Sequence, residues 1–389
     1  MKSFIHLVAR TILPAVLTCA ATADPIDYEY LEARIDLLME RDDMMGLAVA
    51  VVEDGEIRFE RGFGKTEENG LSVDTDTLFR WASVSKGLSA TLAAELASEG
   101  AFSLDSHISD YKTSLRLPGF GEEKASVRDL LSHRLGIVSN AYDNVLESGR
   151  EPADIRQTLG GLNLICPVAE CHGYQNVAFD AISEIFKETT GLEFEALAKS
   201  KVFEPLGMKT ATTTYTGFTG SKNYARPYSW SSSSKKLYAS TITMPYFRVA
   251  TAGGVSSSIH DLALYLQAQM GLYPDVFRPD ALIEAHSPYV RTLREERGMG
   301  RRFEGVERAD YALGWRVYSY HGRTLIGHRG AVRGYRALVF FDPELKTGVV
   351  ALWNSGVSRP TGLQFEVMDM VYGLPKRDWM RLMTDEPRG

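Results

Sequence analysis

Ser83 and Lys86 are the two residues whose types and spacing most directly suggest chemistry. They stand in the run Phe79-Arg80-Trp81-Ala82-Ser83-Val84-Ser85-Lys86, which leads into an apolar helical pattern over residues 87–100. Residues three apart share one face of a helix, so the amine can reach the hydroxyl. A serine attacks a carbonyl well only when a neighbouring base removes its proton, and lysine can be that base when burial or nearby charge lowers its pKa. The spacing therefore predicts acyl transfer by Ser83, with Lys86 as the activating group.

The Ser-x-x-Lys pattern alone is weak evidence, because this chain contains it elsewhere. Ser232/Lys235 and Ser233/Lys236 also match, but they lie in the polar stretch 229–236, which is expected to be a surface loop. The alternative for Ser83 itself is a helix N-cap that precedes a solvated lysine.

Five further segments discriminate between these interpretations. They are Leu130-Leu131-Ser132-His133-Arg134-Leu135-Gly136, Gly173-Tyr174-Gln175-Asn176, Glu204-Pro205-Leu206-Gly207-Met208, Ala252-Gly253-Gly254-Val255-Ser256-Ser257 and Gly327-His328-Arg329-Gly330. Together with the Ser83 segment they resemble, in order and approximate spacing, the serine β-lactamase and penicillin-binding protein superfamily, particularly class C β-lactamases, D,D-peptidases and related esterases. The resemblance covers roughly residues 46–355 and implies an acyl-enzyme on Ser83 without metal or cofactor. Six ordered matches favour catalysis over the N-cap interpretation.

The second motif of this superfamily, Tyr-x-Asn, has two candidates here. We prefer Tyr174-Gln175-Asn176 over Tyr142-Asp143-Asn144, because a helical pattern follows it and it lies about ninety residues beyond Ser83. By resemblance, Tyr174 shares a proton with Lys86 and passes it to the leaving group, and Asn176 donates to the amide carbonyl of the substrate. The alternative for Tyr174 is a buried packing tyrosine.

The third motif also has two candidates. Class C β-lactamases carry Lys-Thr-Gly on an inner strand, but Lys346-Thr347-Gly348 follows Asp342-Pro343 and is expected in a turn between the last strands. His328-Arg329-Gly330 occupies the matching place. By resemblance, His328 orients or holds substrate, Gly330 allows close backbone approach, and the N–H groups of Ser83 and Ala331 form the oxyanion hole.

Other polar residues are expected to have lesser roles. His133 and His260 lie in segments that look structural in the superfamily, so neither is expected to take part in the chemistry. Arg329, Arg333 and Arg336 can meet a substrate carboxylate, although at least two of them are expected to be solvated surface side chains.

Sequence patterns typical of strands lie at both chain ends, with helical patterns between them. Strands are expected over residues 47–52 and 57–63, joined by Asp54-Gly55, and over residues 311–320, 324–328, 335–341 and 347–353. Helices are expected over residues 27–41, 87–100, 126–133, 176–191 and 258–270. This pattern predicts a two-lobe α+β fold in which an antiparallel sheet built from both ends is flanked by helices. Residues 24–100 and 300–389 form the α/β lobe, residues 101–299 an inserted, mainly helical lobe, and the site lies between them.

The first 23 residues are typical of a secretory signal peptide. A basic start and an apolar stretch precede Ala21-Thr22-Ala23, and the interruptions at Arg10 and Pro14 make a retained membrane anchor the weaker alternative. A periplasmic or secreted bacterial protein is expected. Cys19 leaves with the signal, and the remaining Cys166 and Cys171 are expected to form a disulfide rather than to bind a metal.

Composition favours an enzyme and argues against nucleic-acid binding. Apolar residues make up 44% and charged residues 24% of the 389 residues, as in ordinary globular proteins. The net charge of −7 and the absence of a long Lys/Arg run give no electrostatic sign of nucleic-acid binding. The expected partner is a small-molecule or peptide substrate with an amide, β-lactam or ester bond; the oligomeric state is left open. The rival class is a non-catalytic penicillin- or peptidoglycan-binding module. His328 in place of lysine favours penicillin-binding, peptidase-like or esterase activity over efficient β-lactam hydrolysis.

Overall fold

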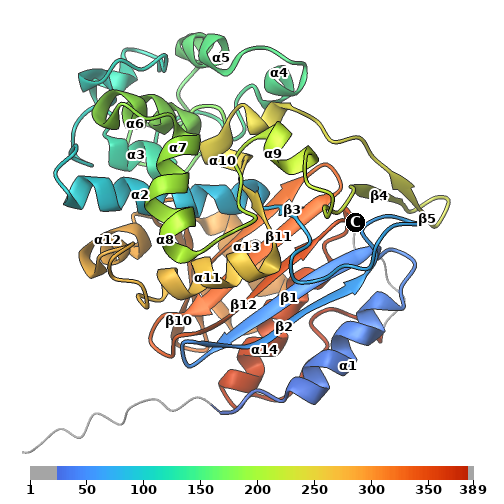
Figure 1. Ribbon diagram of the computed structural model, residues 1–389. Helices are drawn as coiled ribbons and strands as arrows, with labels where there is room; N and C mark the ends of the chain where they lie inside the picture. Colours follow the sequence, from blue (N-terminus) through green and yellow to red (C-terminus); the bar gives the residue numbers. More distant parts are fainter. Residues whose placement is uncertain (1–23, 384–389) are drawn as a thin grey trace, which may run out of the picture.

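An eight-stranded antiparallel sheet forms the centre of the molecule (Figure 1). The computed structural model describes residues 24–383. The strands lie in the order β2-β1-β12-β11-β10-β9-β8-β7. Their bounds are β1 Gly46–Glu53, β2 Glu56–Gly64, β7 Val290–Arg291, β8 Val306–Tyr311, β9 Arg316–Tyr320, β10 Arg323–Val332, β11 Tyr335–Asp342 and β12 Thr347–Trp353. Two small ladders pair β3 Phe79–Arg80 with β6 Ser256–Ser257, and β4 Tyr228–Ser231 with β5 Lys236–Ala239.

The sheet joins the two ends of the described chain, because β1 lies between β2 and β12. Leu47 faces Trp353 in the register of β1 and β12. The β1–β2 turn is Asp54-Gly55, and both residues have positive φ, 53° and 80°, as the predicted two-residue hairpin requires. The predicted fold class, with its antiparallel sheet flanked by helices, is confirmed.

Both faces of the sheet are buried, and alternate residues of each central strand enter different cores. On β1, Ala48, Ala50 and Val52 belong to one core and Leu47, Val49 and Val51 to the other. The first core also holds side chains of α2 Ser85–Ser98 and α11 Ile259–Gln269, and the second holds side chains of α1 Tyr28–Met39 and α14 Leu363–Val371. Two helical layers therefore enclose the sheet, and α2 lies in the layer that also contacts the inserted helices.

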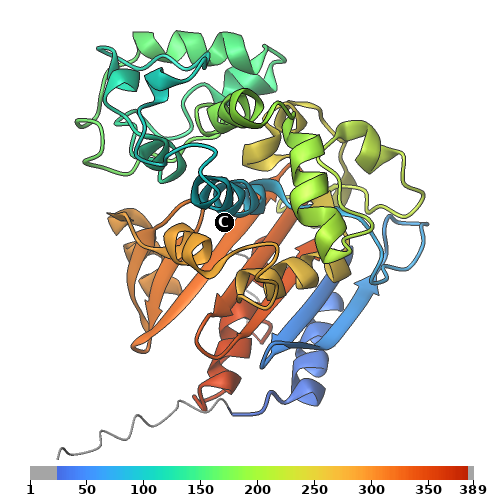
Figure 2. The same ribbon diagram turned by 60° about the vertical axis from the view of Figure 1, so that its left-hand side comes forward.

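The remaining helices are short and lie mostly between the sheet-forming ends of the chain. They are α3 Val127–Leu131, α4 Asp143–Glu147, α5 Pro152–Thr158, α6 Ile182–Thr190, α7 Phe194–Ala198, α8 Glu204–Leu206, α9 Tyr215–Thr219, α10 Ala250–Gly253, α12 Pro279–His286 and α13 Leu293–Arg302. Figure 2 shows the cyan and green segments gathered above the sheet, with α2 between them and the strands. Within the predicted helical lobe, α11 nevertheless packs against β1 and β12, and the predicted lobe boundaries stay a prediction.

Three sequence predictions of individual elements need correction. Residues 311–320 are not one strand: β8 ends at Tyr311 and β9 begins at Arg316, because Gly314 turns the chain with φ 69°. Residues 229–236 are not a plain loop but the tip of the β4–β5 hairpin. The helix expected over residues 176–191 becomes α-helical only at Ile182, after a 3-10 turn at Phe179–Ala181. The short edge strand β7 was not predicted at all.

Candidate active site

Ser83 lies in a tight turn that the surrounding backbone holds firmly. A 3-10 turn at Ala82–Val84 precedes α2, and Ala82 has a φ of 49°, a conformation that is uncommon for a residue with a side chain. The N–H of Trp81 donates to the carbonyl of Val255 at 2.9 Å, and the N–H of Val255 donates to Ser85 Oγ at 3.0 Å. Ser83 itself is only partly buried. The fold thus holds an accessible serine at the start of a buried helix, as predicted.

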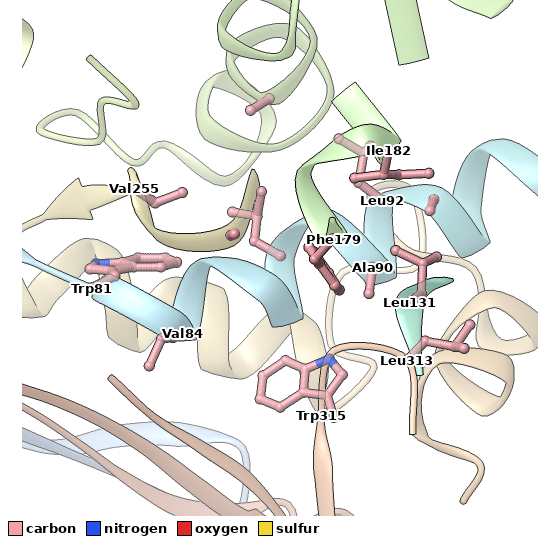
Figure 3. Close-up of a cluster of buried hydrophobic side chains, with 14 of the residues drawn as sticks. Trp81, Val84, Ala90, Leu92, Leu131, Phe179, Ile182, Val255, Leu313 and Trp315 are labelled. Atoms are coloured by element: carbon pink, nitrogen blue, oxygen red, sulfur yellow. The ribbon is translucent and has the colours of Figure 1, made fainter. Parts of the chain in front are cut away.

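A dense apolar cluster surrounds α2 and fixes its position. Figure 3 shows Trp81 and Val84 at the start of the helix, with Phe179 and Trp315 on neighbouring segments. All four side chains are fully buried. A side chain at position 87 would meet the ring of Trp315 at 2.6 Å, so Gly87 is needed one residue after Lys86. This packing leaves little room for the helix to move relative to the sheet.

Lys86 is fully buried and has two oxygen acceptors. Its Nζ donates to Asn176 Oδ1 at 2.6 Å and to the carbonyl of Ala252 at 2.8 Å. The ring of Tyr174 lies 4.7 Å from the same nitrogen. A neutral lysine amine has two N–H groups and one lone pair, so these two acceptors can take both N–H groups and leave the lone pair free. The structure therefore brings Lys86, Tyr174 and Asn176 together, one helical turn beyond Ser83.

Asp143 is a site residue that the sequence analysis missed. Its Oδ2 accepts a hydrogen bond of 2.6 Å from Asn176 Nδ2, so Asn176 bridges Lys86 and this carboxylate. Burial raises the pKa of Asp143, against the opposing effects of Asn176 and Lys86. Asp143 belongs to the Tyr-x-Asn run that we rejected as the second motif, and no spacing rule pointed to its middle residue.

His133 holds the segment that carries Tyr174. The carbonyl of His133 accepts from the N–H of Gly173 at 2.8 Å, and its Nδ1 accepts from the N–H of Gln175 at 3.2 Å. Its ring packs 4.4 Å from the ring of Tyr174. The segment is therefore fastened on both sides of Tyr174 by one buried residue, which agrees with the structural rather than chemical role expected for His133.

A chain of hydrogen bonds links this segment to the third motif through Tyr311, another residue that the sequence analysis missed. His133 Nε2 lies 3.2 Å from the Tyr311 hydroxyl, which lies 3.1 Å from His328 Nε2. His328 Nδ1 lies 2.9 Å from the carbonyl of Arg329. The three side chains are 0% to 2% exposed. Tyr311 was missed because the sequence pattern placed it at the start of a strand over residues 311–320, whereas it is the last residue of β8.

Backbone groups at both ends of this chain of hydrogen bonds decide which atom donates and which accepts in each bond. His133 Nδ1 accepts from the N–H of Gln175, so the proton of this ring is on Nε2, which donates to the Tyr311 hydroxyl. His328 Nδ1 faces a carbonyl and must donate, so His328 Nε2 carries no proton and accepts from the Tyr311 hydroxyl. Burial lowers the pKa of both histidines well below the ordinary value. Both rings are therefore neutral with fixed tautomers, and His328 uses both nitrogens within the protein. The predicted role of His328, to orient or hold the substrate, stays a prediction.

The buried neutral histidines predict acid sensitivity. The unfolded chain binds protons on its histidines below about pH 6.5, whereas folded His133 and His328 do not until a much lower pH. The contribution of these two histidines to the unfolding free energy should thus be fully present above about pH 6.5. It should be lost as the pH decreases toward the folded pKa values. Urea unfolding at pH 7.5, 6 and 5 measures this trend. Equal midpoints with equal slopes at the three pH values would contradict the assignment of neutral rings.

Gly330 lies against the turn that carries Ser83. A Cβ at Gly330 would stand 2.0 Å from the carbonyl oxygen of Trp81 and 3.1 Å from Ala82 Cβ. The glycine is therefore required by the approach of the protein's own backbone, in addition to the substrate approach that we expected. Ala331, the next residue on β10, is exposed. The predicted oxyanion pair, the N–H groups of Ser83 and Ala331, thus comes from two segments in contact.

Lys346 lies far from this arrangement, as the sequence predicted. It is exposed in the turn between β11 and β12, with a φ of 47°, at the opposite end of β11 from the residues that pair with Gly330 and Ala331. Lys346→Ala is expected to change kcat/KM less than twofold and the unfolding free energy by less than about 0.5 kcal/mol. Steady-state kinetics and urea unfolding test this. A large loss of activity in this variant would show that Lys346, and not His328, belongs to the third motif.

The disulfide expected between Cys166 and Cys171 is present, with a Cα–Cα distance of 6.2 Å. It closes the loop that leads into Tyr174, and the carbonyl of Gly136 accepts from the N–H of Ile165 beside it at 2.8 Å.

The double variant Cys166→Ser, Cys171→Ser should lower the unfolding free energy by about 2 kcal/mol, as expected for a short ring. Thiol titration of the unfolded, unreduced protein should find no free thiol at these two positions. Two titratable thiols there would contradict the bridge.

Several other sequence candidates lie outside the site. Ser232 and Ser233 are in the exposed turn of the β4–β5 hairpin, and His260 pairs with Glu60 at 3.1 Å. Arg329 forms a salt bridge with Glu295. Of the three arginines proposed for a carboxylate, only Arg333 and Arg336 lack such a bridge within residues 24–383. Within the same residues, no helix is both long and apolar enough to cross a membrane.

The fold and the site together define the class of serine β-lactamases and penicillin-binding proteins. The sheet joins both chain ends, Ser-x-x-Lys begins a buried helix, and the Tyr-x-Asn and His-x-Gly segments meet beside it. A family model described as Beta-lactamase matches residues 31–366, so the chain belongs to the beta-lactamase family. The resemblance inferred from sequence is confirmed.

Known relatives are hydrolases of several kinds. The Unguisins hydrolase ungD' of Aspergillus campestris is 24% identical over 94% of this chain and 70% of its own length, and a D-aminopeptidase of Brucella anthropi is 24% identical over 92% and 65%. The esterase EstB of Burkholderia gladioli is 27% identical over 49% and 54%. The solved octameric penicillin-binding protein homologue from Pyrococcus abyssi has a TM-score of 0.79 and 24% identity, covering 90% of this chain and 78% of its own, which shows the shared fold. The chain thus spans between half and about two thirds of these curated relatives, and they support a hydrolase of this family.

Proposed function

We propose that this protein is an exported serine hydrolase that cleaves amide, β-lactam or ester bonds through an acyl-enzyme on Ser83. The observation that carries the proposal is the environment of Lys86, a fully buried amine that donates to Asn176 Oδ1 and to the carbonyl of Ala252. A lysine that serves only solubility has no reason to be buried among these groups. Its place one turn after Ser83 supports the role of proton acceptor.

The reaction proceeds in two halves. Ser83 Oγ attacks the carbonyl carbon while its proton passes to the Lys86–Tyr174 pair, and the oxyanion lies between the N–H groups of Ser83 and Ala331. Collapse of the tetrahedral intermediate breaks the bond to the leaving group, and the leaving group takes the proton from the same Lys86–Tyr174 pair. Water then attacks the acyl-enzyme and gives one proton to the pair. The bond between the acyl carbon and Ser83 Oγ breaks, the pair passes that proton to Ser83 Oγ, and the carboxylic acid leaves. No redox step or additional reactant is required.

The choice of His328-Arg329-Gly330 as third motif favours peptidase-like or esterase activity over efficient β-lactam turnover. The names of the D-aminopeptidase and esterase relatives point in the same direction. The rival, a non-catalytic binding module of the same fold, is opposed by the complete set of Ser83, Lys86, Tyr174 and Asn176 in one place.

One purified sample tests the proposal against four substrates. A chromogenic cephalosporin, a D-Ala-D-Ala peptide, a D-alanine p-nitroanilide and a short p-nitrophenyl ester are compared for turnover by the wild type and by Ser83→Ala. Turnover of at least one that is lost in Ser83→Ala supports the hydrolase. Stable labelling by penicillin without turnover of any substrate favours the binding module instead.

Export is the second part of this proposal. The predicted signal peptide, residues 1–23, lies outside the residues that the structure describes. We expect mature protein from a periplasmic or culture fraction to begin at Asp24, and N-terminal sequencing measures this directly. Secreted protein that still begins at Met1 would contradict the signal peptide.

A further inference from the structure

A cavity of about 690 Å³ lies beside the predicted oxyanion strand. Its walls include the end of β10 and the following turn, the β4–β5 hairpin, and the segment 356–359. Ala331 lines it directly, and so do Tyr246 and Glu147, whose side chains are joined by a hydrogen bond of 3.1 Å. The cavity therefore begins where the carbonyl of a bound substrate would lie.

Arg336 gives this cavity an uncompensated positive charge. It stands on β11 directly opposite Ala331. Its side chain is partly buried and donates to the carbonyl of Tyr335 at 3.2 Å. Burial alone lowers its pKa. Within residues 24–383 it forms no salt bridge, in contrast to buried arginines such as Arg34 and Arg156, each of which has carboxylate partners. Removing a charge from water without a partner is costly, so a ligand anion would relieve this cost.

The other charges around the cavity leave a positive balance. Arg333 lines it at the exposed turn after β10 and has no salt bridge within the described residues. Arg359 and Asp43 also line it, but they pair with each other at 3.4 Å. Glu147 is the remaining carboxylate, against two unpaired guanidinium groups. Guanidinium groups match the two oxygens of a carboxylate particularly well.

The position of Tyr174 indicates which half of the substrate enters the cavity. Tyr174, proposed to protonate the leaving group, stacks against His328 at 6.2 Å between ring centroids. The cavity extends from Ala331 in the opposite direction along β10, toward Arg333. The leaving group therefore lies on the His328 side and the acyl group on the Arg336 side.

We infer that Arg336, assisted by Arg333, forms a subsite for a carboxylate on the acyl half of the substrate. This inference rests on the proposed acylation of Ser83 and adds a substrate class to it: acyl donors that carry a second, free carboxylate.

A matched pair of esters tests the subsite. Mono-p-nitrophenyl glutarate and p-nitrophenyl valerate have acyl chains of the same length and differ in the terminal carboxylate. The wild type should prefer the glutarate ester in kcat/KM, and Arg336→Gln should reduce this preference about ten- to a hundred-fold, as expected for loss of a charge-assisted contact. Arg336→Lys should retain part of the preference for the glutarate ester, and Arg333→Gln should reduce this preference less than Arg336→Gln does. Added salt should weaken the preference of the wild type.

Arg297→Gln is the control, because it removes the same charge from an exposed position on α13 that does not line the cavity. It should leave the preference unchanged. If both esters are hydrolysed and Arg336→Gln keeps the wild-type preference, the subsite is disproved while the proposed function stands. If neither ester turns over, the rate of Ser83 labelling is measured instead of kcat/KM. Two fluorophosphonates of equal length are compared, one with a terminal carboxylate and one neutral, and equal labelling rates in the wild type overturn the inference. Absence of Ser83 labelling by either reagent would instead count against the proposed function.

Discussion

Replacing Lys86 with methionine is expected to lower kcat/KM by at least about 10³-fold, close to the loss caused by Ser83→Ala, because a nucleophile and its base act as one unit whose losses do not add. The double variant should therefore be little worse than either single variant. Methionine keeps most of the buried stem of the lysine but cannot accept the Ser83 proton. A fluorescent penicillin or fluorophosphonate should label the wild type and leave Ser83→Ala unlabelled.

Folding has to be checked in the Lys86 variant, because Asn176 Oδ1 and the carbonyl of Ala252 lose their donor. Urea unfolding is expected to show a loss of about 1–3 kcal/mol for acceptors left unpaired in the interior. Ser232→Ala and Ser233→Ala are the matched controls, since both sit in other Ser-x-x-Lys patterns, and they should behave as the wild type. Covalent labelling that persists in Ser83→Ala, or that depends on Ser232 or Ser233, would refute the assignment of the nucleophile.

The second large effect is expected from Tyr311→Phe, which removes one hydroxyl and leaves the ring in place. His133 Nε2 then loses its acceptor and His328 Nε2 loses its donor. The His328 ring is then held only by the bond from its Nδ1 to the carbonyl of Arg329, so its orientation is less firmly fixed. We expect kcat/KM to fall about ten- to a hundred-fold, with most of the loss in kcat, because Tyr311 positions other residues and does not reach the substrate. His328→Ala should fall about ten- to a thousand-fold, corresponding to about 1.4–4 kcal/mol of transition-state stabilisation.

Tyr320→Phe is the control for a purely structural effect. Its hydroxyl donates to Asp369 in the core on the other face of the sheet, so this variant should lose stability but keep kcat/KM. Equal activity in Tyr311→Phe and wild type at 25 °C would show that the hydrogen-bond chain does not support catalysis. A loss of activity that tracks only the unfolded fraction would lead to the same conclusion.

Sequence reasoning identified the parts of the site that obey local rules. The spacing of Ser83 and Lys86 follows from the helix repeat, and the Asp54-Gly55 turn follows from backbone preferences, so both could be predicted from short segments. The choice of His328 over Lys346 followed from the order of strands and turns, and the structure places Lys346 at the far end of β11.

The missed residues act through contacts that no local pattern contains. Tyr311 joins His133 to His328 across segments separated by 178 and 17 residues, and Asp143 meets Asn176 from a helix of only five residues. The split of residues 311–320 was missed for a related reason. The chain turns at Gly314, where glycine is required because a Cβ would stand 2.3 Å from the carbonyl oxygen of Lys86, and that neighbour is distant in sequence.

The pairing of β1 with β12 has a consequence for how the chain becomes active. Leu47 finds its partner Trp353 only after about 300 further residues have been synthesised, and contacts this distant in sequence form late and slowly. Gly330, which supports the Ser83 turn, also belongs to this late part of the chain. A nascent chain that ends before β12 therefore leaves β1 with an open edge and an unfinished site. Truncation within the last strands should yield an inactive, aggregation-prone product rather than a partly active enzyme.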